Sequence, residues 1–268
     1  MQGISKMPPK KIVGRALLAI LAASCLAPMN FAQKKTLRVA AAADLQAAMP
    51  EIAKVFEART GTSVEVAYGS SGNFYAQIQN GVPLDVFFSA DNEYPRKLEE
   101  SGFAEPHSAA IYGIGKIVLW MPANAKCDPE RDGWQCLQDP VVRKIAIANP
   151  AHAPYGCAAV AALQKAGIYD AVKAKLVLGE NISQAAQFVQ SGNAEAGILA
   201  YALALSPALQ GGKKWVVPTE LHPPIEQSVV VLKSAKDKPA AQEFVKFVTR
   251  GAGREILAKY GFEPRPAR

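Results

Sequence analysis

The chain has 268 residues and a formal net charge of +7. Four of its 30 basic side chains and none of its 23 acidic ones fall within residues 1–32, which leaves a net charge of only +3 on the rest. This near balance argues against a protein that binds nucleic acid, which needs a clustered basic face. The remaining length is enough for one large domain or two small ones.

Residues 1–32 have the pattern of a signal peptide. Basic residues precede the apolar run ALLAILAASCLAPM, whose 14 residues are too few to cross a bilayer but typical of a signal-peptide core. We expect cleavage after Ala32 and export of the mature protein. A lipid anchor on Cys25 is the alternative, because residues 22–25, AASC, weakly resemble a lipobox. We favour cleavage after Ala32, since alanine stands at position 22 where leucine is usual.

Strand-like and helix-like segments alternate through the rest of the chain. In chain order, the predicted strands are 36–43, 64–68, 84–90, 116–120, 144–148, 175–179, 196–201 and 228–232. The predicted helices are 45–56, 71–80, one that ends at Gly102, 154–167, 182–192, and 239–260 with a break near GAG. This alternation predicts an α/β fold with mainly parallel sheets.

Asp44 directly follows the first predicted strand and precedes an apolar stripe at helical spacing. An aspartate in this position is a favoured helix N-cap. Pro50 lies about six residues further on, so we expect the helix to kink or restart there.

Four junctions between a strand and a helix carry small and polar residues. They read AAAADL, YGSSGNF, NPAHAPYG and LGENIS. In open α/β sheets ligands bind beyond the carboxyl ends of the strands. The first turn of a helix offers unpaired N–H groups and a partial positive charge. The four junctions therefore predict an anion site that needs no lysine or arginine.

The cysteines favour a disulfide over a metal site. Cys127 and Cys136 flank the turn-rich segment DPERDGWQ, and in an oxidising compartment we expect them to pair. The alternative is two free thiols in a surface loop. Cys157 is expected to be a small buried residue. The three histidines lie far apart in the sequence, and no spacing of histidine and cysteine predicts a metal centre.

The order and spacing of several motifs resemble one family. AAAADL, YGSSGNFYAQI, GVPLDVFFSAD, NPAHAPYG, LGENISQAAQFVQSGNAEAGI and KYGF are similar to segments of the substrate-binding proteins of molybdate ABC transporters, the ModA family. The resemblance covers about residues 37–262. It implies a type II periplasmic-binding-protein fold, in which two α/β lobes, each a mainly parallel sheet flanked by helices, are joined by hinge strands.

The same resemblance implies the domain boundaries and the function. Lobe I would comprise residues 33–111 plus 223–268, and lobe II residues 112–222, with the signal peptide at 1–32. The family captures molybdate in the cleft between the lobes and delivers it to the membrane permease of an ABC importer. We therefore expect a monomeric periplasmic protein that binds molybdate, and tungstate as well, without a cofactor and without enzymatic activity.

In lobe I the family holds the oxyanion with two serines. The second falls on Ser71, which matches, whereas the first falls on Asp44, which does not. Ser70 is left open between a turn residue and a second hydroxyl donor.

In lobe II the family's backbone donors fall on Tyr155, in APYG, and on Ile182, in ENIS. The family's site tyrosine falls near Tyr201, which is a candidate only. All these residues would contact the oxygens of molybdate, and none would be a direct ligand of a metal.

Asp44 is hard to reconcile with a dianion. A carboxylate ~4 Å from a dianion is repelled by about 8 kcal/mol at an effective dielectric of ~20. Asp44 would therefore cap its helix and turn away, which we favour, or be protonated and act as a donor. In a third alternative the ligand arrives with a proton that Asp44 accepts.

Two other functions stay open from the sequence. The cargo would be another tetrahedral oxyanion (sulfate, thiosulfate or phosphate), and Asp44 would suit phosphate as a proton acceptor. A serine hydrolase with Ser71 as nucleophile is the remote alternative. The glycines of GSSG do not have the spacing of a nucleophile elbow, and nothing in the spacing recommends His152 and Asp85 as the rest of a triad.

Overall fold

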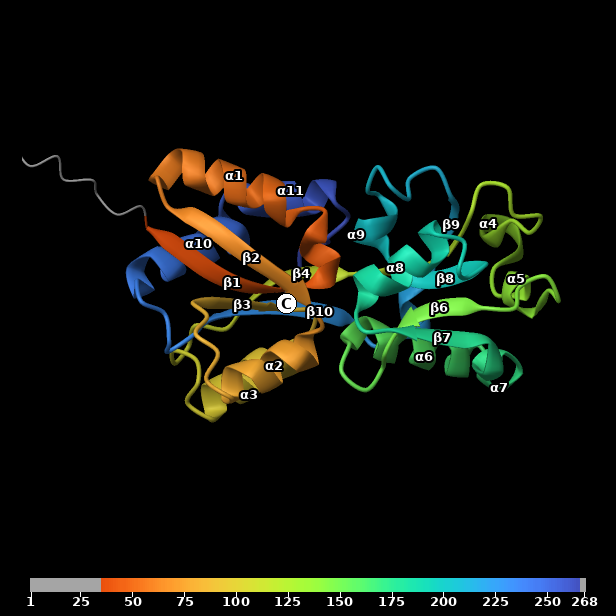
Figure 1. Cartoon of the computed structure of the whole chain (residues 1–268), viewed down its shortest axis with the longest axis horizontal. Coiled ribbons are helices and arrows are strands. Elements are labelled where there is room, and N and C mark those ends of the chain that lie inside the picture. The colour runs from red at the N-terminus through yellow and green to blue at the C-terminus, as the bar shows by residue number, and fades with distance from the viewer. Residues whose placement is uncertain (1–34, 266–268) are drawn as a thin grey trace, which may run out of the picture. The chain divides into compact units, whose positions relative to one another are not determined.

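The computed structural model describes residues 35–265, which are built around two five-stranded sheets (Figure 1). The predicted signal peptide, with its cleavage site at Ala32 and the alternative anchor at Cys25, lies outside the described residues. Within residues 35–265 no helix combines the length and the apolar character needed to cross a membrane.

The first sheet combines segments from both ends of the described chain. Its strand order is β2-β1-β3-β10-β4. The strands are β2 (Ser63–Gly69), β1 (Thr36–Ala42), β3 (Val86–Ser89), β10 (Ile225–Val231) and β4 (Ala110–Gly115).

The second sheet is built from the middle of the chain. Its order is β7-β6-β8-β5-β9. The strands are β7 (Leu176–Gly179), β6 (Ile145–Ala148), β8 (Ala196–Ala200), β5 (Ile117–Met121) and β9 (Lys213–Val216). Lys116 alone separates β4 of the first sheet from β5 of the second, and the chain returns between β9 and β10.

The two sheets share one pattern of strand directions. β10 is antiparallel to both of its neighbours in the first sheet, and so is β5 in the second. The remaining pairs, β1 with β2 and β3, and β6 with β7 and β8, are parallel. The predicted α/β class is confirmed, but the sheets are mixed, because one strand in each runs against the other four.

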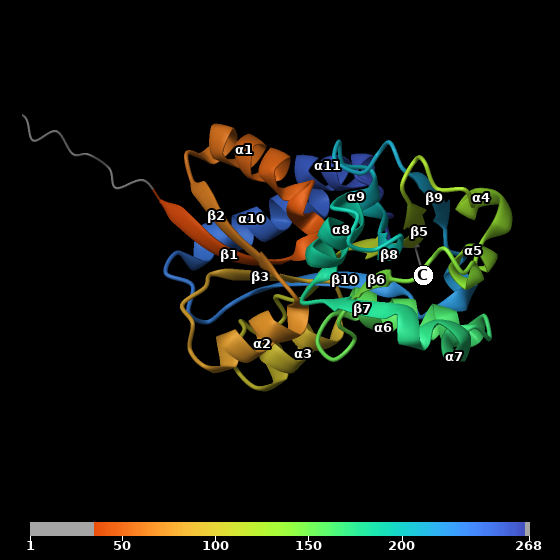
Figure 2. The ribbon, with the colours of Figure 1, turned by 45° about the vertical axis from the view of Figure 1, so that its right-hand side comes forward.

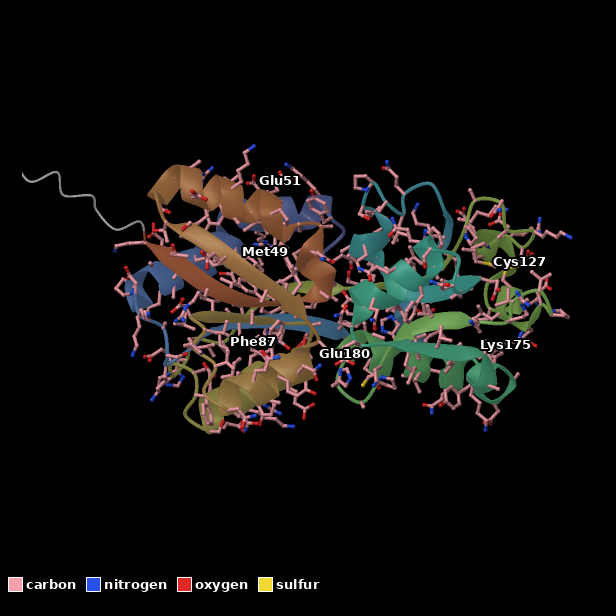
Figure 3. The ribbon with its side chains drawn as sticks, in the orientation of Figure 1. Met49, Glu51, Phe87, Cys127, Lys175 and Glu180 are labelled. Atoms are coloured by element: carbon pink, nitrogen blue, oxygen red, sulfur yellow. A yellow bond between two sulfur atoms is a disulfide. The ribbon has the colours of Figure 1, made fainter. Side chains whose placement is uncertain are left out.

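Helices cover both faces of the first sheet. α1 (Met49–Thr60), α10 (Lys238–Arg250) and α11 (Ala252–Lys259) pack on one face, and α2 (Ser71–Gln79) and α3 (Glu93–Glu100) on the other (Figure 1). Side chains of successive strand residues point to opposite faces. Phe88 accordingly packs in the α1–α10–α11 layer, whereas Phe87 packs against α2 and α3. Figure 3 shows Met49 and Phe87 on opposite sides of this sheet.

The second sheet is also covered on both faces. Figure 2 shows α8 (Ile182–Gln190) and α9 (Tyr201–Ala204) on one side of it, and α6 (Pro154–Lys165) and α7 (Tyr169–Val172) on the other. The short helices α4 (Pro129–Asp132) and α5 (Gln135–Gln138) lie at its far end (Figure 1). Three 3-10 turns complete the elements: η1 (Ala43–Gln46), η2 (Lys173–Lys175) and η3 (Thr219–Leu221).

The first helical segment restarts as Pro50 predicts. Residues 43–46 form η1, and α1 begins only at Met49, with Pro50 in its first turn. Proline fits this place because the first N–H groups of a helix have no partner within it. The break near GAG is also present, since Gly251 separates α10 from α11.

Two strands escaped prediction. β4 reads AIYGIG, in which two glycines weaken the strand pattern. β9 reads KKWV and has no hydrophobic run that would predict a strand, in keeping with its partial burial. The disulfide between Cys127 and Cys136 is confirmed. Cys157 is a free cysteine and is exposed, so its predicted burial is wrong.

Candidate functional site

All four polar junctions meet at one cavity. Its lining comes from the end of β1 with η1, from the β2–α2 junction, from the start of α6, from the start of α8 and from Ala90. The lining residues are Ala42, Ala43, Asp44, Gly69, Ser70, Ser71, Ala90, Ala153, Pro154, Tyr155, Asn181 and Ile182. The cavity is small, with a volume of about 10 Å³, which is roughly the room for one water molecule.

The lining contains no lysine, arginine or histidine. An anion in this cavity would therefore meet only neutral donors and the carboxyl group of Asp44. Three of the four junctions begin helices of nine residues or more, α2, α6 and α8. Their N-termini carry partial positive charge.

Ser71 is the first residue of α2 and is almost completely buried. Its Oγ accepts a hydrogen bond from the backbone N–H of Ala90 at 2.9 Å. Because this bond uses only a lone pair, the hydroxyl proton of Ser71 remains available for a ligand.

Ser70 has a different role in the same turn. It is the N-cap of α2, and its Oγ accepts from the N–H of Asn73 at 3.4 Å. The same Oγ lies 3.0 Å from Nδ1 of His152. Its hydroxyl group is thus engaged by protein atoms on two sides.

The backbone donors predicted in the second half of the site lie at the starts of α6 and α8. Tyr155 follows Pro154 in the first turn of α6, whose N-cap Ala153 makes no side-chain cap. Ile182 is the first residue of α8, and its N-cap Asn181 accepts from the two following N–H groups instead, those of Ser183 and Gln184.

Three N–H groups at the cavity are therefore left for a ligand. Within residues 35–265 the N–H groups of Ser71, Tyr155 and Ile182 donate to no protein acceptor. The N–H of Gly72, by contrast, is taken by the carbonyl of His152 at 2.9 Å.

Asp44 lies in the 3-10 turn η1 and caps no helix, so the predicted N-cap role is wrong. Instead its Oδ2 accepts from the hydroxyl of Tyr155 at 3.0 Å and from Nε2 of Gln227 at 2.8 Å. The residue is fully buried, and its other oxygen, Oδ1, has no partner among the described residues. The prediction failed because α1 begins only at Met49, after the 3-10 turn, and this start lies beyond the reach of the Asp44 side chain.

Burial raises the pKa of Asp44 from 3.8 to about 6, although the hydrogen bonds from Gln227 and Tyr155 and the nearby backbone N–H groups of Asp44 and Leu45 act in the opposite direction. Removing a carboxylate from water destabilises its charged form, and no cation at the cavity compensates. Burial, with Asp44 nearby, also raises the pKa of the Tyr155 phenol well above its usual range, so this hydroxyl stays neutral.

Gln227 was missed by the sequence reasoning. It lies on β10, is fully buried, and donates to Tyr155 at 2.8 Å as well as to Asp44. Its Oε1 accepts from the hydroxyl of Tyr112 on β4. No local pattern marks a glutamine whose partner is 183 positions away. Gln227 lies between Glu226 and Ser228, in the polar half of β10, so its own sequence neighbourhood gives no sign that it is buried.

Gly115 is required beside this network. A Cβ at this position would lie 2.4 Å from the Tyr155 hydroxyl oxygen and 2.5 Å from Nε2 of Gln227. Both distances are far below contact distance, so any larger residue would displace the groups that hold Asp44.

Tyr201 is not brought to the cavity. It begins α9, its N–H bonds to the carbonyl of Lys116, and its ring lies against Gly261. It borders a different hollow beside β9, where its neighbours include Asp128 and Trp215.

Further contacts join the two halves around the cavity. Nδ2 of Asn73 donates to Oε1 of Glu180, and Oγ of Ser183 pairs with Oε1 of Gln46. Figure 3 shows Glu180 beside the start of α2, between the two sheets. Together with the bond from Gly72 to His152, these contacts hold the cavity closed.

The geometry does not support a hydrolase centred on Ser71. Its Oγ contacts the N–H of Ala90, and no histidine among the described residues bonds to it. Asp85 lies at the start of β3 and accepts from the backbone N–H groups of Arg38 and Lys236. Asp85 therefore does not act as the acid of a triad that orients His152.

Comparison with known proteins places the chain among solute-binding proteins. Residues 37–263 match the family described as bacterial extracellular solute-binding protein. The molybdate-binding protein ModA of Azotobacter vinelandii is 43% identical over 232 residues, which is 86% of this chain and 91% of that protein. ModA of Rhodobacter capsulatus is 40% identical over 223 residues, or 83% and 86%.

The fold matches as well. The solved structure of the Azotobacter vinelandii periplasmic molybdate-binding protein aligns with a TM-score of 0.81 at 35% identity. The match covers 86% of this chain and 100% of that one. The two sheets with their helices thus correspond to the two lobes of a periplasmic binding protein.

We expect Asp44→Asn to stabilise the free protein at neutral and alkaline pH. The pKa of Asp44 is raised to about 6 in the folded protein. Its contribution to the free energy of unfolding is therefore fully present below pH 3.8, and it is lost as the pH rises through about 6. The ionised group then costs on the order of 3 kcal/mol of unfolding free energy. Asparagine can still accept from Tyr155 and Gln227 but carries no charge.

Urea unfolding of both proteins without any oxyanion checks this. The variant should be more stable by on the order of 3 kcal/mol at pH 8, and the difference should shrink toward pH 4. Comparing the two proteins at each pH removes the effects of all other titrating groups. A difference that does not change with pH would contradict the prediction.

Proposed function

Because the chain belongs to the bacterial extracellular solute-binding proteins, we propose that it captures molybdate between its two lobes and delivers it to an ABC importer. The relatives named above are molybdate-binding proteins. Tungstate has almost the same size and charge, so we propose that it binds too. The ion is cargo, and the proposal includes neither a cofactor nor catalysis.

One observation carries this proposal. Three unpaired N–H groups, those of Ser71, Tyr155 and Ile182, line a cavity that also contains the free hydroxyl proton of Ser71 and no cationic side chain. Hydrogen bonds to a charged group contribute about 1.5–3 kcal/mol each. Several fixed donors therefore offset the loss of water around the ion without a counter-charge.

The ligand contacts proposed are Asp44, the N–H and hydroxyl of Ser71, and the N–H groups of Tyr155 and Ile182. Ser70 is given a supporting role, because its hydroxyl is occupied by Asn73 and His152. Tyr201 is left out, since it does not line the cavity.

We propose lobe I as residues 33–111 plus 223–268 and lobe II as residues 112–222, with hinges where the chain crosses between sheets. The return of the chain between β9 and β10 spans the second boundary, whereas the first crossing, at Lys116, comes only after β4, which belongs to the first sheet. Opening at these hinges would separate α2 from α6 and α8 and release the ion.

The proposed setting is the periplasm, because the solved relative from Azotobacter vinelandii is a periplasmic protein. Export would use the signal peptide, with cleavage after Ala32 favoured over a lipid anchor on Cys25. The loaded protein would act as a monomer that docks on the membrane permease. The relatives do not favour another oxyanion (sulfate, thiosulfate or phosphate) as the cargo, and thermal-shift assays distinguish these ions from molybdate.

We expect molybdate and tungstate to raise the melting temperature of the mature protein, and sulfate and phosphate to leave it unchanged. A ligand at 1,000 times its dissociation constant stabilises by about 4 kcal/mol, or very roughly 8–16 °C for a protein of this size. Thermal-shift assays with the four ions check this. A shift with sulfate or phosphate alone would show that the cargo is that ion and not molybdate. No shift with any of the four ions would overturn the proposed function.

Ser71→Ala should raise the dissociation constant for molybdate tenfold or more. The variant loses one hydrogen bond to a charged group, on the order of 1.5–3 kcal/mol, and leaves the N–H of Ala90 without its acceptor. Isothermal titration calorimetry measures the change. Ser191→Ala, which removes an exposed hydroxyl at the end of α8, is the matched control, and equal constants for both variants would exclude Ser71.

Gly72→Ala should weaken binding without unfolding the protein. A Cβ at Gly72 would lie 2.8 Å from the carbonyl oxygen of His152 and 2.7 Å from the Tyr94 hydroxyl, so it obstructs the approach of the lobes. Overpacking of this kind costs about 1–3 kcal/mol, which corresponds to a loss of roughly 5- to 150-fold in affinity.

Gly211→Ala is the control for Gly72→Ala, because a Cβ there meets nothing within 4 Å. Titration with molybdate and melting curves of both variants separate binding from folding. Unchanged affinity in Gly72→Ala would show that the lobes do not need to close at this point.

A further inference from the structure

The two carboxyl oxygens of Asp44 differ sharply in their surroundings. Oδ2 accepts two hydrogen bonds, from the Tyr155 hydroxyl and from Nε2 of Gln227. Oδ1 is buried, belongs to a residue that lines the cavity, and has no hydrogen-bond partner in the described part of the chain. A buried acceptor without a donor is unfavourable, but a carboxyl group whose proton sits on Oδ1 would have a donor facing the ligand.

We propose that Asp44 binds the oxyanion as a neutral carboxylic acid, donating a hydrogen bond from Oδ1, so that each dianion enters the site together with one proton. This inference rests on the proposed function and specifies how that site holds a doubly charged ion. Asp44 then determines specificity, because it favours ligands that accept a hydrogen bond at this point.

The charges around Asp44 lead to this protonation state. The titratable groups that face it are the phenols of Tyr155 on α6 and Tyr112 on β4, and burial raises the pKa of both well above the usual range. Both phenols therefore stay neutral and supply no positive charge. An ionised Asp44 beside a dianion would concentrate three negative charges in a buried site, which is strongly unfavourable.

Other ionisable side chains lie one layer further out. Asp91 accepts from Ser89 and from backbone N–H groups at the start of α3. His152 contacts Ser70 on one side, and its Nε2 lies 3.7 Å from Glu180 on the other. His152 is the one group here that could add positive charge, so it needs its own control.

The proton balance is simple. The free protein holds Asp44 with a pKa raised to about 6 by burial, so the group is mostly ionised at pH 8. Binding of the dianion then takes one proton from the solvent onto Oδ1, and the loaded site carries the two charges of the ion alone. Monohydrogen phosphate would bring its own proton and would leave Asp44 ionised as the acceptor.

The experiment measures molybdate affinity and proton uptake together. Calorimetric titration of the mature protein at pH 5, 6, 7, 8 and 9, with dilute molybdate and two buffers of different ionisation enthalpy, gives both quantities. Above the pKa we expect the dissociation constant to rise about tenfold per pH unit, with uptake of about one proton per ion. Below pH 6 both effects should fade.

Two variants assign the proton. Asp44→Asn places an amide donor where the acid would have its O–H, so it should bind molybdate with an affinity that is independent of pH and without proton uptake. His152→Gln should keep the wild-type pH dependence. Loss of the dependence in His152→Gln, with its retention in Asp44→Asn, would assign the proton to the histidine and overturn the inference.

The remaining outcomes separate this inference from the proposed function. Tight molybdate binding by the wild type with a flat pH profile and no proton uptake would overturn the acid role of Asp44 and leave the function intact. Binding of phosphate without proton uptake, in preference to molybdate, would overturn both the cargo and the acid role. Absence of binding to any of these ions would overturn the proposed function itself.

Discussion

The structure depends on one constraint: a doubly charged anion must be buried in a cavity that no cationic side chain lines. Neutral donors must then converge from several directions. The starts of helices supply them, because the first N–H groups of a helix have no partner within it. Parallel strands place their carboxyl ends at one edge of a sheet. The ends of β1 and β2 in one lobe and of β6 and β7 in the other therefore supply the helix starts that meet at the cavity.

The reversed strands link this site to the crossings between the lobes. β10 runs against its neighbours, begins directly after one crossing, and carries Gln227, which holds Asp44 and Tyr155. β4 ends at the other crossing, at Gly115, whose missing side chain leaves room for the same network. Asp44 directly follows β1 and Gln227 lies on β10, both strands of the first sheet, whereas Tyr155 belongs to the helix α6 on the second. A change of hinge angle would therefore move Tyr155 relative to Asp44, so that lobe closure and the environment of this carboxyl group are mechanically coupled.

The parts of the site that could be predicted are those encoded locally. Ser71, Tyr155 and Ile182 lie at strand-to-helix junctions, where short motifs determine the start of a helix, and the structure brings these junctions together. The role of Asp44 could not be predicted in this way. Its partner Gln227 is 183 residues away, and whether an aspartate caps a helix or turns into the interior depends on where the helix begins and on which distant strand lies beside it.

The donors on Oδ2 explain how the fold tolerates an acid in the middle of an anion site. Tyr155 and Gln227 both donate to the same oxygen, so a proton on the carboxyl group is driven to Oδ1, the oxygen without a partner among the described residues. A serine at this position would offer a donor at every pH, whereas an aspartate offers one only when it is protonated. Replacing a neutral donor by a carboxyl group thus converts an affinity fixed by geometry into one set by geometry and proton concentration together.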